Sequence, residues 1–493
     1  MQQKLDAATK PCERKKVLNA QNNLPDSLVA AFTGPDNYRA ANAVFNLVNQ
    51  TLAALCLPAP FIQPGDRVVL KPNWVKEHDE RFPGPDQWEH VVTHPLVIEA
   101  VARWAAEKLH NKGSITICDA PQTDSSFAKI RDYCGLDQML SRLQVVFPKI
   151  EFALLDLRPE EWSAIDGVTV SKTRLPGDPS GNTHVRLDSA SEFLGYHGQG
   201  RLYGASYDMA ETNAKHDGKR HEYLLCRTPM DADVFINLPK LKTHKKVGVT
   251  CALKNLVGIN ANKNWLPHHT EGAPDQGGDQ FPATTTRARL EHAWMGAAKR
   301  WLKDRHAASR LFVPIKKFGR LVFGDTQNVI RSGNWHGNDT CWRMVLDLNK
   351  CFFFFDGLGQ PRKKPIRYLA VVDGIIAGEG NGPMSPDAKP CGVILAGTHP
   401  VAVDCVAATL MGFDWLKLRL LRNSFAIRKM NFVHFQPDKI QVVSNKAGWS
   451  GTLDRICGPF NFRPHFGWIG AIESNSPPPE AVPARSRGTR VQS

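Results

Sequence analysis

The chain has 493 residues, of which 42% are hydrophobic and 22% are charged. This is the composition of a globular protein, and it excludes a collagen, a coiled coil and a chain that is disordered throughout. No apolar run approaches the roughly 18 residues of a membrane helix, and the N-terminus lacks the apolar core of a secretory signal, so we expect a cytoplasmic protein.

The protein is basic, with a formal net charge of +14 and an arginine-rich segment at 287–320. Such a segment is typical of a solvated helical face, and it is also typical of contact with an acidic partner or an anionic membrane surface. No nucleic-acid-binding motif accompanies the charge, so no specific nucleic acid is expected. The 11 cysteines are scattered without a CxxC pair. We therefore expect reduced thiols and no iron–sulfur cluster, and the sequence sets no oligomeric state.

Short β-type runs alternate with helical patterns along the chain. Pro95 suits the first turn of a predicted helix, and Pro239 would end a predicted strand. The alternation predicts an α/β fold of mainly parallel sheets with helices on both faces, which binds ligands beyond the carboxyl ends of its strands. Strands are predicted at 66–74, 114–121, 231–244, 367–382 (running into a glycine-rich loop) and 391–397, and helices at 94–111 and 399–412.

The polar ends of the chain frame the predicted core. Residues 1–25 are expected to be flexible, and the Pro- and Arg-rich tail 475–493 to be disordered. The α/β core would cover 26–474, either as one unit or as two lobes at about 60–260 and 350–470.

Two long regions without a clear period interrupt this core. Residues 156–225 and 261–345 are rich in Gly and polar residues. Loops of this length are usually functional or disordered, so we expect both to be insertions that build or cover a site.

Cationic residues gather in the segment 237–260, around a predicted strand end. So many cations are costly unless solvent or an anion neutralises them. Because Leu, Val and Cys alternate with them, an anion-binding or catalytic loop is favoured over a solvated one. The catalytic candidates are His244, Lys254 and Lys242, with Lys240 and Asn255 as ligands of the substrate.

Two further segments contain residue types that bind divalent metals. His268 and His269 follow Trp265 in a Gly/Pro-rich loop that ends at Asp279, and adjacent side chains on extended backbone point to opposite sides, so one histidine could act while the other packs. A glycine-rich stretch carries Asp373 and Glu379. Carboxylates in such a stretch suit metal binding or acid–base work. The candidate metal ligands are therefore His268, His269, Asp279, Asp373 and Glu379.

Other polar residues lie at strand ends or helix starts, where capping is the competing explanation. Asp404, near the start of a predicted helix, also leaves capping and ligand contact open. The remaining candidate substrate-binding residues are Lys71, Asn73, His94, Asn334 and Asp339.

Several motifs, in order along about residues 60–415, resemble those of the DUF362 family. The family's activity is largely undefined, and the ferredoxin-type cysteine motifs of some relatives are absent here. The motifs are KPNW (71–74), THP (93–95), the LPKLKTH to LVG run (238–258), NWLPHH (264–269), the GNW to WR run (333–343) and VDGIIAGEGNGP (372–383).

A more distant resemblance, to the lactate racemase N-terminal family, lies in Lys242, His244, Gly248 and Lys254. It implies that His244 is an acid/base residue, that Lys254 holds a nickel-pincer nucleotide, and that a later histidine near 268–269 ligates nickel. A glycine pair of that family is replaced here by Ala and Leu before Lys254.

The leading hypothesis is an enzyme that acts on a small anionic hydroxy or carboxylate substrate by isomerase-like, racemase-like or other metal-dependent acid–base chemistry. It would use the Lys/His loop, with a divalent metal or a nickel-type cofactor as the candidate cofactors. The alternative is a non-catalytic module that binds an anionic polymer, a glycan carrier or a membrane surface through 287–320.

Overall fold

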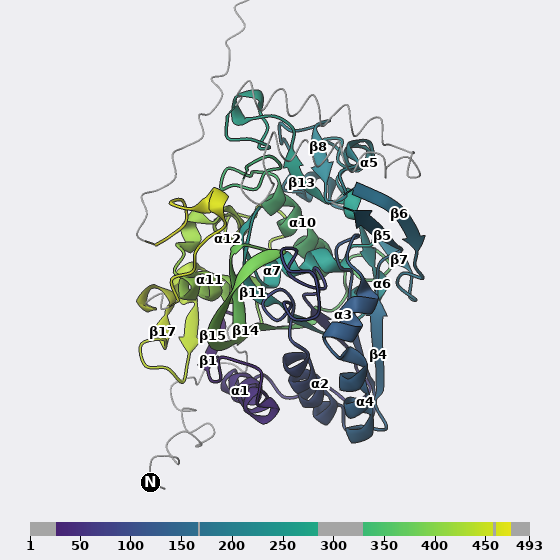
Figure 1. The fold of residues 1–493 in the computed structure, drawn as a ribbon, viewed down its shortest axis with the longest axis vertical. Helices are drawn as coiled ribbons and strands as arrows, with labels where there is room; N and C mark the ends of the chain where they lie inside the picture. Colours follow the sequence, from purple (N-terminus) through teal and green to yellow (C-terminus); the bar gives the residue numbers. More distant parts are fainter. Residues whose placement is uncertain (1–25, 166–167, 284–328, 457–459, 475–493) are drawn as a thin grey trace, which may run out of the picture.

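The computed structural model describes residues 26–165, 168–283, 329–456 and 460–474 (Figure 1). The predicted flexible segment 1–25, the predicted tail 475–493 and the basic segment 287–320 lie outside these residues. Within the described ranges, no helix combines the length and the apolar character needed to cross a membrane.

A large mixed sheet organises the described chain, and six of its ten strand pairings are parallel. Its order is β17-β16-β1-β15-β14-β10-β2-β3-β4, with β11 paired to β14 and β12 paired to β11. This confirms the predicted α/β class. The strands are β1 (Leu28–Thr33), β2 (Arg67–Pro72), β3 (Ser114–Asp119), β4 (Glu151–Asp156), β10 (Val234–Leu238), β11 (Lys240–His244), β12 (Gly248–Thr250), β14 (Arg367–Asn381), β15 (Ser385–Gly397), β16 (Gln441–Val443) and β17 (Gly451–Thr452).

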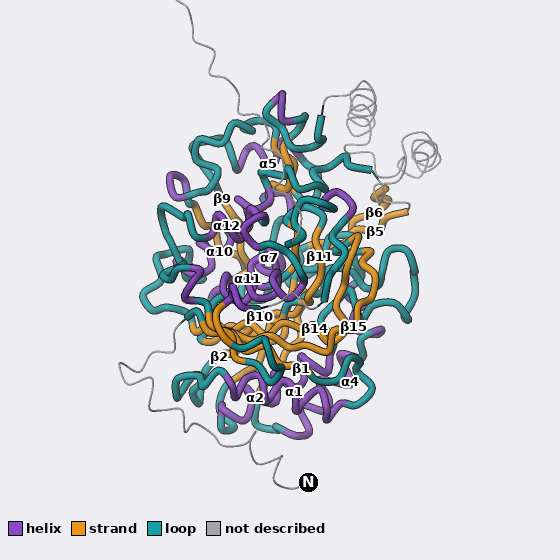
Figure 2. Tube along the Cα trace, turned by 90° about the vertical axis from the view of Figure 1, so that its left-hand side faces the viewer, coloured by secondary structure: helices purple, strands orange, loops and turns teal. Residues whose placement is uncertain are grey.

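Helices cover both faces of this sheet, as Figure 2 shows for α1, α2 and α4 on one side and α7, α10 and α11 on the other. The pleat of each strand divides its side chains between two cores. In β2, Val68 and Leu70 enter one core and Val69 enters the other. The helices are α1 (Ala41–Ala54), α2 (Pro95–Leu109), α3 (Phe127–Tyr133), α4 (Leu136–Val146), α5 (Met209–Lys215), α6 (Arg227–Met230), α7 (Ala252–Asn255), α10 (Cys341–Phe354), α11 (Pro400–Met411) and α12 (Arg419–Ser424).

The two regions that break the alternation form small antiparallel pairs rather than extending the sheet. Strand β5 pairs with β6, β7 with β9, and β8 with β13. Figure 1 shows β8, β13 and α5 together at one end of the molecule, beyond the large sheet. The strands are β5 (Glu160–Ile165), β6 (Val168–Arg174), β7 (Asn182–Arg186), β8 (Leu202–Gly204), β9 (Glu222–Cys226) and β13 (Pro267–Thr270).

Local sequence signals fix most boundaries. The Nδ1 atom of His94 accepts the Leu96 N–H at 3.1 Å, which caps α2 where Pro95 begins it. The glycine-rich loop predicted after residue 367 is wrong, because β14 continues to Asn381. Pairing with β15 over this whole length satisfies the backbone, and a register shift between Gly374 and Ile376 accommodates the glycines.

The chain reverses its direction of travel across the sheet between β2 and β10. From β2 it proceeds outward through β3 to β4, and it later returns to β10, on the other side of β2, before β14. Because β10, β2 and β3 are parallel, their carboxyl ends lie at one edge of the sheet. Such a reversal point is where open α/β sheets bind ligands.

Candidate functional site

A cavity lies at this reversal point, with about 1000 Å³ of empty space out to the solvent at its mouth. Residues after β2 and β3 form one wall, and β11, β12 and α7 form another. The regions predicted as insertions also contribute, through 205–207 and His268. The polar and charged lining residues are Lys71, Asn73, Asp119, Gln122, Thr123, Ser206, Tyr207, His244, Lys245, Lys246, Thr250, Lys254, Asn255, Lys263 and His268.

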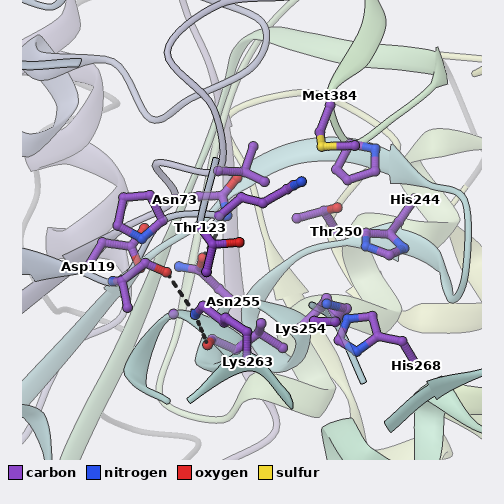
Figure 3. Close-up of a pocket in the computed structure, with 18 of the residues that line it drawn as sticks. Asn73, Asp119, Thr123, His244, Thr250, Lys254, Asn255, Lys263, His268 and Met384 are labelled. Atoms are coloured by element: carbon purple, nitrogen blue, oxygen red, sulfur yellow. Dashed lines mark hydrogen bonds between the residues drawn. The ribbon is translucent and has the colours of Figure 1, made fainter. Parts of the chain in front are cut away.

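One wall is a closed hydrogen-bond network, seen around Asp119 and Asn255 in Figure 3. Lys71 Nζ donates to Asp119 Oδ1 at 2.7 Å and to Asn255 Oδ1 at 3.2 Å, and Asn73 Nδ2 donates to Asn255 Oδ1 at 2.9 Å. A Cβ on Gly258 would lie 1.9 Å from Asp119 Oδ1, so only glycine permits this close approach. The wall is therefore rigid.

The opposite wall carries two histidines with different ring protonation, and Figure 3 shows Lys254 beside them. His244 Nδ1 accepts the Lys246 N–H at 3.0 Å, so the proton of the neutral ring is on Nε2. His268 Nδ1 lies 2.8 Å from the Leu266 carbonyl oxygen, to which it must donate, so its Nε2 is a free acceptor. The cavity therefore has one imidazole donor and one imidazole acceptor.

Both rings are held neutral. Burial, followed by the charge of Lys254, lowers the pKa of His244 and that of His268 well below 6.5. Burial also lowers the pKa of Lys254 itself, with a further contribution from the charge of Lys245. Asp119, which pairs with Lys71, is the one carboxylate among the described residues that line the cavity, so positive charge is in excess there.

Lys254 is presented by the short helix α7, whose start is fixed from α11. The Asp404 carboxylate accepts the Ala252 N–H at 2.7 Å and the Leu253 N–H at 3.0 Å. Burial raises the pKa of Asp404 to about 7. Asp404 is thus a cap that positions Lys254, and the capping alternative accounts for its contacts.

Six of the predicted site residues line this one cavity. Two predicted lysines of β11 instead bind partners outside the cavity. Lys242 Nζ donates to the Val91 carbonyl oxygen, and Lys240 Nζ forms a 2.7 Å ion pair with Asp373. The His94 ring stacks on Tyr38 at 3.6 Å. The residues in the cavity are Lys71, Asn73, His244, Lys254, Asn255 and His268.

The predicted metal ligands lie apart. The Asp279 carboxylate accepts the Thr270 N–H at 2.6 Å and the Thr340 hydroxyl at 2.6 Å, and Glu379 pairs with Lys389 at 2.8 Å. The His269 ring stacks on Tyr203 at 4.6 Å, outside the cavity that His268 lines. Across the described ranges, no three His, Cys, Asp or Glu residues come together as a metal site.

Two more predicted substrate ligands lie outside the cavity. Asp339 pairs with Arg343 at 2.9 Å and with Arg419 at 2.8 Å, and Asn334 Oδ1 accepts the Arg331 N–H at 3.0 Å. Both sets of contacts are local or hold loops together.

Sequence reasoning missed several lining residues. Lys263 follows the dense basic segment, and its Nζ donates to the Ala120 carbonyl oxygen at 2.9 Å. The Thr250 hydroxyl is buried without a partner among the described residues. Tyr207 has a φ of +67°, which is rare for a bulky side chain. The THKK run at 243–246 could have signalled Lys245 and Lys246 directly.

Comparison with known proteins finds a family that matches part of the chain. Residues 177–409 match the family described as "Domain of unknown function (DUF362)". This match confirms the resemblance to that family which the motifs carry. The matched part includes β11, β12, α7 and His268, and so one wall of the cavity.

Two known proteins are similar to this chain at low identity. The "Thylakoid-associated protein sll1697" of Synechocystis sp. is 22% identical over 355 residues, which is 72% of this chain and 65% of that protein. The lactate racemase apoprotein of Thermoanaerobacterium thermosaccharolyticum is 12% identical with a TM-score of 0.28, and the match covers 79% of this chain and 59% of that one.

Proposed function

We propose that the protein is an enzyme that transfers a proton on a small hydroxy- or carboxylate-bearing anion, in the manner of an isomerase or racemase. The observation that supports it most is the pair of neutral histidines of opposite ring protonation, His244 and His268, beside Lys254 in one cavity. Acid–base catalysis requires a group that accepts a proton and a group that donates one, both within reach of one substrate.

In this proposal His268 is the base and His244 is the donor. The free Nε2 of His268 takes the substrate proton, while the Nε2–H of His244 stabilises the negative charge that develops on a substrate oxygen. Hydrogen bonds to Leu266 and to the Lys246 backbone fix the two rings in these roles. The cationic lining attracts the anion and orients it.

The substrate itself would activate the base. The neighbouring lysine charges lower the pKa of His268, which keeps the ring neutral and also makes it a weak base. An anion bound among these lysines offsets their charge and so raises that pKa towards neutrality. Proton transfer would then become efficient only when the cavity is filled.

Exchange of carbon-bound hydrogen for deuterium tests the proposal. The wild-type protein in D₂O, incubated with a panel of 2-hydroxy acids and phosphorylated hydroxy acids, should remove the α-proton signal of at least one compound by proton NMR. His268→Gln and His244→Gln should each slow this exchange about 100-fold or more, the usual size of an acid–base contribution.

His269→Gln is the matched control, because it changes the neighbouring imidazole, which stacks on Tyr203 and does not line the cavity, although its Nδ1 lies 3.3 Å from the Nζ of the lining residue Lys246. It should retain exchange, and melting temperatures of all variants would identify any that fail to fold. Exchange that survives His268→Gln but is lost in His269→Gln would contradict the proposal, as would a wild-type protein inactive on the whole panel.

A nickel-pincer-type cofactor would occupy the same residues. Lys254 would hold it and His268 Nε2 would ligate the metal; both line the cavity, and their cavity-facing nitrogens have no partner among the described residues. When bound, such a group supplies redox chemistry at the hydroxyl-bearing carbon. It would also take the lone pair that the base role requires. Nickel content and visible absorbance of wild-type protein, compared with Lys254→Met, separate the two roles.

The competing function is a non-catalytic one, in which the basic segment 287–320 binds an anionic polymer, a glycan carrier or a membrane surface. The name of the Synechocystis relative refers to thylakoid association, which favours the membrane surface among these partners. Binding to anionic vesicles should weaken steeply with salt, since screening lengths fall to about 3 Å at 1 M. Charge reversal at Arg300, Lys303, Lys316 and Lys317 should abolish it; partitioning that resists salt would contradict this function.

A further inference from the structure

The cavity is lined by several cations that have no carboxylate at ion-pair distance among the described residues. Lys246, Lys254 and Lys263 are buried and Lys245 is half-buried, and the charges of Glu80 and Asp124 act on Lys245 from further away. Lys71 pairs with Asp119, whereas Lys245, Lys246, Lys254 and Lys263 form no ion pair with any described residue. Lys246 and Lys263 at least donate to backbone carbonyls. Lys245 and Lys254 have no side-chain hydrogen bond among the described residues.

Lys245 and Lys254 line the same cavity, and the charge of Lys245 contributes to lowering the pKa of Lys254. Lys254 is buried and Lys245 is half-buried, and two amines of like charge in such a cavity are unfavourable unless an anion lies between them. A single carboxylate would neutralise only one of the two. A ligand group with two negative charges would match both.

An unsatisfied hydroxyl adds a third donor. Thr250 is 3% exposed and lines the cavity, and its Oγ1 has no partner among the described residues. A phosphoryl group has up to two charges and three strong acceptor oxygens. The set of Lys245, Lys254 and Thr250 offers it two positive charges and three donor groups, which match its charge and its three oxygens, whereas a carboxylate carries a single charge on two oxygens.

The opposite wall of the cavity contains a buried acceptor that lacks a donor. Asn73 Nδ2 is committed to Asn255, which leaves Asn73 Oδ1 as an acceptor, and this atom is buried without a partner in the part of the chain that the structure describes. Asn73 lines the same cavity. A hydroxyl on the ligand would satisfy it.

We propose that the cavity binds a small phosphorylated hydroxy compound, with its phosphoryl group on Lys245, Lys254 and Thr250 and a hydroxyl donating to Asn73. The proposal names the substrate class on which His268 and His244 would act, and in that respect it rests on the proposed function. The binding of the phosphorylated compound does not depend on that function.

Titration calorimetry with inorganic phosphate as the probe tests the phosphoryl subsite. Phosphate should bind the full chain at one site, and acetate at equal ionic strength should bind at least tenfold more weakly. Lys245→Gln, Lys254→Gln and Thr250→Val should each weaken phosphate at least several-fold. The exposed Lys439→Gln is the matched control and should bind as wild type does. Circular dichroism confirms that each variant is folded.

The hydroxyl subsite has its own ligand pair, ethyl phosphate and 2-hydroxyethyl phosphate. The hydroxylated ester should bind several-fold more tightly to the wild type, and Asn73→Ala should remove that preference. Equal affinities in the wild type overturn the assignment of Asn73.

Phosphate that binds no better than acetate, or that binds Lys245→Gln and Lys254→Gln as it binds the wild type, overturns the phosphoryl subsite. His268→Gln should keep its phosphate affinity, so binding and proton transfer fail separately. Deuterium exchange on unphosphorylated hydroxy acids without phosphate binding would leave the proposed function intact and reject this inference. Phosphate binding without any exchange would do the reverse.

Discussion

Lys240 and Asp373 form an ion pair whose side chains are both fully buried, at 2.7 Å. The Tyr38 hydroxyl donates to the same carboxylate at 2.6 Å, and the His94 N–H donates to it at 2.9 Å. Replacing Lys240 with Met leaves the carboxylate charged and buried without its counter-ion. Loss of one partner of a buried pair costs about 3–5 kcal/mol of unfolding free energy.

The double variant Lys240→Met/Asp373→Leu tests this reasoning. If the two charges serve mainly each other, removing both should cost less than the sum of the single variants. What remains is the loss of an acceptor for the Tyr38 hydroxyl and the His94 N–H, at about 1–3 kcal/mol each. Guanidinium denaturation followed by tryptophan fluorescence measures the four free energies of this cycle. Single variants below about 1 kcal/mol, or a double variant equal to the sum, would refute it.

The same variants separate a structural pair from the substrate-binding and metal-binding roles that the sequence predicted for Lys240 and Asp373. Neither residue lines the cavity. Phosphate affinity and deuterium exchange should therefore remain near wild type in the folded double variant. Loss of phosphate binding or of deuterium exchange in this variant would support a functional role for Lys240 and Asp373.

Two further predictions concern positioning and pH. Asp404→Asn replaces one carboxylate oxygen, which accepts a backbone N–H at the start of α7, with an amide donor. The variant should lose about 1–3 kcal/mol of unfolding free energy, and it should bind phosphate more weakly because Lys254 is no longer held in place. An unchanged unfolding free energy together with an unchanged phosphate affinity would contradict the positioning role. Burial lowers the pKa of His216 to about 3 and that of His399 to about 4, so the unfolded chain binds more protons below pH 6.5. Stability should fall between pH 6.5 and 4 by about 1.4 kcal/mol per pH unit for each such histidine, and His399→Asn should flatten the denaturation profile.

The strands and helices that the sequence predicted are those whose signals are local. Apolar periodicity marked the strands and helices, and the His-Pro pairs at 94–95 and 399–400 lie at the starts of α2 and α11. The position of the cavity also followed, since parallel strands place their polar carboxyl ends at one edge. The end of β14 did not follow, because its glycines are strand residues only in the presence of β15.

The sequence could not predict which lysines have a structural role and which line the cavity. Lys240 and Lys242 look like Lys254 in composition and spacing, but their partners Asp373 and Val91 lie 133 and 151 residues away along the chain. Asp279 looked like a metal ligand beside His268 for the same reason, whereas its carboxylate binds Thr340 and the loop that precedes α10. Such distant partners decide which polar groups remain free for a ligand.

The polar groups without partners in the cavity differ from the other buried polar groups of the described chain. Outside the cavity, the buried amine of Lys240 has a carboxylate and that of Lys242 has a backbone carbonyl, and most buried polar atoms are satisfied. In the cavity, the amines of Lys245 and Lys254, one hydroxyl and one amide oxygen have no hydrogen-bond partner among the described residues, beside two histidines fixed in opposite protonation. Departures of this kind persist where they serve a ligand, because they cost stability and give no structural return. These unpartnered groups are the observation on which the proposal of a bound anion rests.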